Sequence, residues 1–275
     1  MDSNNSILNR KVIDKRIYIP YGLEIEAENI SFDLGKRLFE HKVNEEWTIG
    51  TDRSLMNCGL ELSSPVLPNN KETIIKLKKI AKTLSFLKPT FEHASLQLNF
   101  SVSEEMQSSI VPLLKMFYVY QDIIYRFSTG VDDKLRSIVD ICAFPLLIKD
   151  RLTRVDEILI NNKFLGVSLK TLTKNKKDSI KAIEFRTPNG TDHFYLWMNY
   201  IVFFSSFLTC IKNKTYDREY INYLFNEIVY DANHLENSVK IDERKAIEFA
   251  NFIYKDEIEK ECFYTQYFDK KIKIK

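Results

Sequence analysis

The sequence predicts an α+β fold in which helices cover one side of a mostly antiparallel sheet. Four segments alternate apolar and polar side chains with the two-residue period of a strand. Longer segments carry apolar side chains at the three- and four-residue spacing of amphipathic helices. A chain of 275 residues, 44% hydrophobic and 28% charged, is typical of one large soluble domain or of one domain with a helical appendage.

The first predicted strand, residues 16–28, has two unlike faces. One face carries Tyr21, Leu23, Ile25 and Ala27, and the other carries Gly22, Glu24, Glu26 and Glu28. Glutamate is depleted in strands, so this face needs an explanation. Either it lies in water, or it binds a divalent cation that relieves carboxylate repulsion of ~4 kcal/mol at 4 Å near a protein surface.

Three further strands have the same design. We expect them at residues 59–65, 94–101 and 182–187, with 47–54 and 164–171 partly extended. Their polar faces present Glu61 and Ser63, then Gln97 and Asn99, then Glu184 and Arg186. Helices on the apolar side would leave these groups together on one concave, acid-lined surface. Carboxylates with one guanidinium there suit magnesium or manganese bridging anionic phosphates, with Arg186 opposite.

Apolar periodicity predicts the helices. The expected ranges are 33–43, 70–87, 104–127 with an interruption near Pro112, 132–148, 149–160, 194–211, 218–230 and 243–254. The segment 194–211 approaches the length of a membrane span but contains Asn199, Ser205 and Ser206. We therefore expect a buried helix behind the sheet, with a membrane span as the weaker interpretation.

Composition excludes several classes of function. A net charge of +2 and a pI of about 8.2 favour neither a nucleic-acid nor a membrane partner. The four cysteines and four histidines are scattered, which disfavours a zinc site, and the polar N-terminus lacks the apolar core of a signal peptide. The seven glycines form neither a GxGxxG motif nor a P-loop. We expect a cytoplasmic protein with reduced thiols.

Four blocks in order resemble the signature of the putative amidoligase family, which belongs with the glutamine synthetase and glutamate–cysteine ligase-like carboxylate–amine ligases. The blocks are GLEIE at 22–26, WTIGTDRS at 47–54, ELSSP at 61–65, and IEFR at 183–186 with Gly190-Thr191. The resemblance spans residues 17–212 and implies a catalytic domain like that of glutamine synthetase, with a helical insert at 104–160. Residues 213–275 would be a C-terminal helical extension packed on the same domain.

The resemblance also implies roles for individual residues. The expected metal ligands are Glu24, Glu26, Asp52, Glu61 and Glu184. Arg186 would contact the transferring phosphate or the substrate, and Arg126 matches a late helical arginine of the family, although it can equally pair with a surface acid. Gln97 and Asn99 stand where amidoligases usually carry HxH and resemble the QxN of glutamate–cysteine ligases, which puts one metal ligand in doubt. His93 lies off that register.

The implied reaction is amide formation that depends on ATP and Mg²⁺ or Mn²⁺. ATP would phosphorylate a carboxylate of a small molecule or peptide, and an amine donor would attack the acyl phosphate. Glu61 or Glu28 would take the amine's proton. Two alternatives remain: a catalytically inert binding module with the ligase fold, and a metal-dependent nuclease. The nuclease is disfavoured because Ser63 and Arg186 stand where the lysine of an ExK motif would lie.

Overall fold

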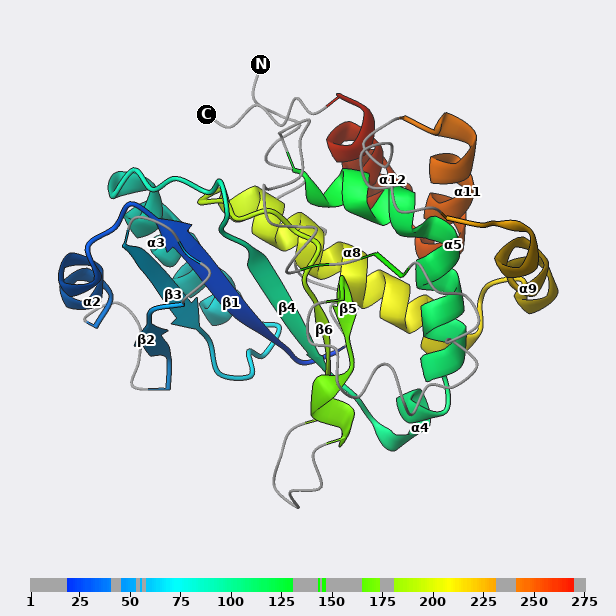
Figure 1. Ribbon diagram of the computed structural model, residues 1–275, viewed down its shortest axis with the longest axis horizontal. Coiled ribbons are helices and arrows are strands. Elements are labelled where there is room, and N and C mark those ends of the chain that lie inside the picture. The colour runs from blue at the N-terminus through cyan, green and yellow to red at the C-terminus, as the bar shows by residue number, and fades with distance from the viewer. Residues whose placement is uncertain are drawn as a thin grey trace.

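The protein is built on a six-stranded antiparallel sheet with strand order β2-β3-β1-β4-β6-β5, as Figure 1 shows. This computed structural model describes residues 19–40, 46–52, 55, 58–130, 143, 145–146, 165–173, 181–230 and 241–269. The strands are β1 (Tyr21–Glu28), β2 (Thr48–Gly50), β3 (Gly59–Ser63), β4 (Leu96–Ser101), β5 (Val167–Ser168) and β6 (Ala182–Phe185). Mixed helix and antiparallel sheet confirm the α+β class.

Helices account for the rest of the regular structure. They are α2 (Phe32–Glu40), α3 (Lys71–Phe86), α4 (Glu104–Gln107), α5 (Ile110–Ser128), α8 (Phe194–Asn213), α9 (Arg218–Glu227), α11 (Glu243–Ile253) and α12 (Glu257–Tyr264), with a 3₁₀ turn at Lys170–Thr173 and a π turn at Thr265–Asp269. The helices predicted at 132–148 and 149–160 fall outside the described residues except at 143, 145 and 146. The helix predicted at 218–230 ends three residues early, and α12 was not predicted.

Capping side chains explain where several helices begin. Asn70 accepts a hydrogen bond from the N–H of Thr73 at the start of α3, and Asp217 and Asp242 cap α9 and α11 in the same way. The break that was expected near Pro112 in the helix at 104–127 occurs a few residues earlier, between α4 and α5. Pro112 itself occupies the first turn of α5, where its missing N–H costs no hydrogen bond.

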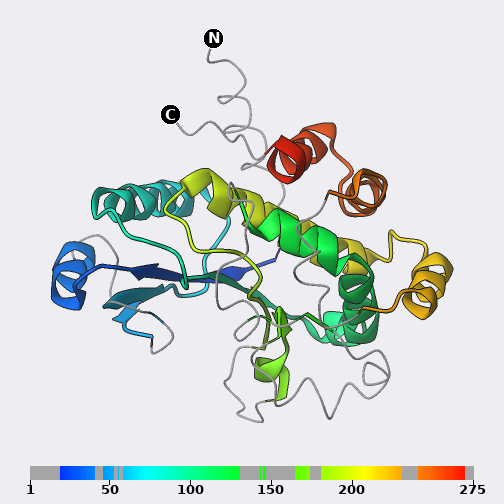
Figure 2. The same ribbon diagram turned by 45° about the horizontal axis from the view of Figure 1, so that its top comes forward.

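Helices α3, α5 and α8 lie over one face of the sheet, which Figure 2 shows nearly edge-on. The apolar side chains of the strands point into this layer. Phe185 of β6 stacks on Phe204 of α8 with ring centroids 4.1 Å apart, and the ring of Phe117 of α5 also stacks on it. Burial of such rings supplies most of the stability of the layer. The polar face is therefore on the opposite side of the sheet.

Helix α8 is the core helix behind the sheet. Among the described residues, this helix is long and apolar enough to cross a membrane, but 72% of its apolar stretch is buried inside the protein. Its rings contact strands and helices, as Phe203 does with Phe127 of α5 at 4.4 Å. This packing fits the expectation of a buried helix.

The C-terminal helices complete the core. Phe263 of α12 stacks on Phe127 of α5 and on Phe203 of α8, with centroid separations of 5.3 and 5.9 Å. Phe249 of α11 stacks on Tyr120 of α5 at 4.5 Å. The described residues after 212 therefore pack on the same domain as the sheet.

Candidate functional site

The strand register brings the polar side chains of distant segments together. Glu24 of β1 lies between Ser63 of β3 and Gln97 of β4, and Glu26 lies opposite Glu61. Residues paired across adjacent strands point to the same face, with Cβ atoms about 4.5–5.5 Å apart. Glu24, Glu26 and Glu61 thus share one surface.

The same surface continues across β4 to β6. Asn99 lies opposite Gly22 on one side and opposite Glu184 on the other. Gly22 carries no side chain, so Asn99 reaches diagonally to Glu24 and donates a hydrogen bond from Nδ2 to Oε1 at 3.0 Å. The polar residues of the four predicted strands therefore lie side by side on one face.

Glu26 is held firmly in this surface although it is only 4% exposed. Ser95 donates to its Oε2 from the backbone N–H at 2.7 Å and from the hydroxyl at 2.6 Å. Gln97 donates from Nε2 to its Oε1 at 2.8 Å. A buried carboxylate needs such donors, and here they fix its orientation toward the polar face.

Glu26, Asp52 and Glu61 form a group whose ligand oxygens all lie within 4.8 Å of one another. Asp52 reaches it from the segment after β2, and Ser63 holds Oε1 of Glu61 with a 2.8 Å hydrogen bond. Oxygens bound at ~2.1 Å to an octahedral ion are ~3 to ~4.2 Å apart. All three donors are carboxylates, the ligand type that Mg²⁺ and Mn²⁺ prefer, so these residues could hold such an ion if their oxygens moved slightly closer together.

Glu24 has a perturbed pKa. Its pKa is raised from 4.5 to about 7, first by burial and then by the charges of Glu184 and Glu61. Arg186 and the hydrogen bond from Asn99 act in the opposite direction. The charges of Glu61, Glu184 and Arg186 therefore act on Glu24 across the same face of the sheet.

Arg186 follows β6 and faces the acids. Its Nη1 donates a 2.7 Å hydrogen bond to Oε1 of Gln97 and also donates to Oε1 of Glu184. Side-chain exposures of 15% for Arg186 and 12% for Glu184 make this a largely desolvated ion pair. The Arg186 guanidinium is thus placed among several carboxylates.

Arg126 lies elsewhere. It is on α5, 6% exposed, and donates from Nε to the carbonyl of Tyr267 at 3.1 Å, with its guanidinium 5.3 Å from the centre of the Tyr267 ring. These contacts tie α5 to the C-terminal segment. Its assignment as a cofactor-binding residue stays a prediction.

The sequence interpretation did not anticipate the role of Ser95 or the pairing of His93 with Glu28. His93 donates its backbone N–H to Oε2 of Glu28, and its Nδ1 lies 3.0 Å from Oε1 of the 2% exposed carboxylate. Ser95 belongs to the polar face of its predicted strand, so its alternation with Leu96 was the available signal. His93 had no such signal because it lies in the loop before the strand.

Comparison of the chain with models of protein families, with curated proteins and with solved structures finds no match.

Proposed function

We propose that the protein is an ATP-dependent ligase that joins a carboxylate to an amine through an acyl phosphate. The observation that carries the proposal is the convergence of Glu24, Glu61, Glu184 and Arg186 on one face of the sheet. The order of motif blocks along the chain agrees with it. In this proposal the sheet corresponds to the catalytic domain of glutamine synthetase-like enzymes, and its acid-lined polar face is the active face.

The carboxylates have the role of holding Mg²⁺ or Mn²⁺. Glu26, Asp52 and Glu61 are the closest group, and Glu24 and Glu184 extend it across the sheet. A bound divalent ion would neutralise charge on the phosphates of ATP. Ser95, Gln97 and Ser63 orient Glu26 and Glu61 for that purpose.

Arg186 has the role of binding the transferring phosphate or the substrate carboxylate. Its contact with Gln97 holds the guanidinium beside the acid group through a neutral amide. Desolvation strengthens a charge-assisted bond to an incoming anion. Glu61, whose oxygen is held by Ser63, is the proposed acceptor of the amine's proton.

An inert binding module is the second candidate, and a specific observation favours it. Arg186, Gln97, Glu26 and Ser95 form a continuous chain of hydrogen bonds within the protein. Such a network satisfies buried polar groups and stabilises the sheet without any chemistry.

Phosphate release from ATP and Mg²⁺, measured across pairs of carboxylates and amines, tests the proposal. The carboxylates to be screened are small acids and peptides, and the amines are ammonia, amino acids and polyamines. We expect Glu24→Ala and Glu184→Ala to abolish release, and Glu227→Ala, which removes an exposed acid at the end of α9, to leave it unchanged. Circular dichroism would verify that each variant is folded.

Three results separate the candidates. Release that requires both Glu24 and Glu184 supports the ligase. Magnesium-dependent ATP binding without release with any pair favours the binding module. Absence of magnesium-dependent ATP binding by the wild-type protein would rule the ligase out.

A further inference from the structure

A pocket of about 470 Å³ lies at the opposite end of the domain from β1, β2 and β3. It is formed where α5 begins, α8 ends and α9 begins. The described residues that line it are Ser108, Ser109, Val111, Pro112, Lys115, Ile211, Lys214, Tyr216, Arg218, Ile221 and Asn222. It shares none of these residues with the polar face of the sheet.

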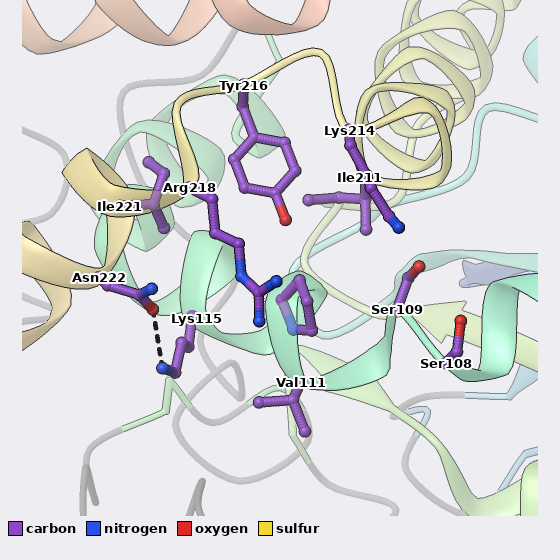
Figure 3. A pocket seen from close by; sticks show the side chains of 11 residues that line it. Ser108, Ser109, Val111, Lys115, Ile211, Lys214, Tyr216, Arg218, Ile221 and Asn222 are labelled. Atoms are coloured by element: carbon purple, nitrogen blue, oxygen red, sulfur yellow. Dashed lines mark hydrogen bonds between the residues drawn. The ribbon is translucent and has the colours of Figure 1, made fainter.

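Three cations from different segments line this pocket. Lys115 comes from α5, Lys214 directly follows α8, and Arg218 is the first residue of α9. Figure 3 shows the Arg218 guanidinium in the middle of the pocket, between Tyr216 and Lys115, with the polar ends of Lys214 and Ser109 farther along it. Like charges that line one pocket repel one another, and a bound anion reduces that repulsion.

No carboxylate offsets these charges among the described residues that line the pocket. Lys115 donates from Nζ to Oδ1 of Asn222 at 2.8 Å, which positions the ammonium but leaves its charge in place. Glu105, on the neighbouring α4, pairs instead with Lys212 at 3.2 Å, and Lys212 is not a lining residue.

Lys214 occupies an unusual backbone position for a lysine. It ends α8 with φ 52° and ψ 41°, the left-handed conformation that helix C-terminal caps most often give to glycine. A side chain there costs about 1 kcal/mol relative to glycine. Lys88 after α3 also has a positive φ, of 50°, and either lysine interacts favourably with the negative end of its helix dipole, so Lys214 is linked to the pocket by its place among the lining residues.

The remaining lining groups suit a phosphate with a small organic body. Tyr216 and Ser109 supply hydroxyl groups, and the Ser109 side chain makes no capping hydrogen bond to α5. The hydroxyl of Ser108 already donates to the carbonyl of Glu105 at 2.8 Å. The N-terminal end of the 19-residue α5 adds the positive end of its helix dipole. Val111, Ile211 and Ile221 form an apolar wall.

We propose that this pocket binds the dianionic phosphate group of a small phosphorylated molecule, either inorganic phosphate or a phosphate monoester. Arg218 supplies the planar donor fork that matches phosphate oxygens, and Lys115 and Lys214 supply point charges. Three positive charges are more than the single negative charge of a carboxylate would neutralise, and they suit a ligand with two negative charges. The proposal does not depend on the ligase function.

Isothermal titration calorimetry with inorganic phosphate and with glycerol 3-phosphate tests it. EDTA is present throughout, so that the acids of the sheet cannot recruit phosphate through a metal ion. We expect saturable binding of at least one probe, and competition by sulfate because it carries the same charge. Tighter binding of glycerol 3-phosphate than of phosphate would identify the ester as the ligand class, and the reverse would identify the free ion.

Two variants and a control locate the binding. Arg218→Gln is expected to weaken binding about tenfold or more, because it removes a charge-assisted contact. Lys82→Gln, which removes an equal charge from an exposed position on α3, is expected to leave affinity unchanged. Equal losses of phosphate affinity in Arg218→Gln and Lys82→Gln, or no saturable binding by the wild-type protein, would overturn the proposal.

Lys214→Gly separates binding from folding. Glycine suits the left-handed backbone, so we expect the melting temperature without ligand to be maintained or raised while phosphate affinity falls. Unchanged phosphate affinity in this variant would contradict a role for Lys214 in the pocket.

Discussion

Gln97 of β4 and Arg186, which directly follows the neighbouring strand β6, are joined by a 2.7 Å hydrogen bond from Nη1 of the arginine to Oε1 of the amide. The Nε2 group of the same amide donates to Glu26 at 2.8 Å. One 3% exposed side chain therefore connects the guanidinium with the acid group proposed to hold a metal.

Gln97→Leu tests this connection. Leucine removes both hydrogen bonds and leaves buried polar partners behind, so we expect the free energy of unfolding to fall by about 1–3 kcal/mol. Urea denaturation measures it. Gln107→Leu on the half-buried surface of α4 is the control, and equal effects of the two substitutions would show that the connection contributes nothing.

Glu24 makes stability depend on pH in the metal-free protein. Its pKa is raised from 4.5 to about 7, so between these values the folded carboxyl holds a proton that the unfolded chain has released. Stability contributed by the neutral form is therefore lost as pH rises through this window. From about pH 4 to pH 8, the unfolding free energy of the wild-type protein should fall by up to about 3 kcal/mol relative to Glu24→Gln. Urea denaturation with EDTA measures the difference, and parallel pH profiles would contradict it.

Asp52→Asn should have opposite effects with and without metal. Without metal the variant should be more stable, because Asp52, Glu26 and Glu61 lie within 4.8 Å of one another and repel. With Mn²⁺ the wild-type protein should gain stability and the variant should bind about tenfold or more weakly. Melting curves across a Mn²⁺ titration measure both effects.

The matched control for Asp52→Asn is Glu227→Gln at an exposed position on α9. It should leave the response to Mn²⁺ unchanged. A loss of metal-free stability in Asp52→Asn, with the response to Mn²⁺ intact, would assign Asp52 a structural role alone.

Phe185 connects the sheet to its helix layer. Its ring is fully buried and stacks on Phe204 at 4.1 Å, so Phe185→Ala should lower the free energy of unfolding by about 3–5 kcal/mol. Phe86→Ala, at a side chain that is 79% exposed, makes the same chemical change and should cost under about 1 kcal/mol. Similar losses of unfolding free energy in the two variants would show that Phe185 is not a core residue.

The sequence predicted the strands of the sheet well because their two faces differ strongly. Leu96, Leu98 and Phe100 alternate with polar residues, and that period places β4 and its buried face without knowledge of its partners. The polar face of β1 was predicted in the same way, so Glu24 and Glu26 could be placed before the strand order was known. Asp52 lies outside any alternating strand and was predicted only from the family resemblance.

Contacts between distant segments could not be predicted in this way. Alternation says which face Ser95 occupies but not that β1 and β4 are neighbours, which is what lets Ser95 hold Glu26. Helix α12 was missed because its eight residues make too few turns for the helical period to be recognised. Its position depends on Phe263, which meets Phe127 and Phe203 only in the folded protein.

The packing of Phe263 and the contact of Arg126 with Tyr267 mean that the motif-bearing segment and the folding unit differ in extent. A chain cut after residue 212 would keep every motif block, but it would lose the rings that pack on α5 and α8 and the Tyr267 carbonyl that accepts a hydrogen bond from Arg126. Recombinant work aimed at a minimal folded unit should therefore retain α11 and α12, since the shorter product would expose the rings of α5 and α8 that these helices cover.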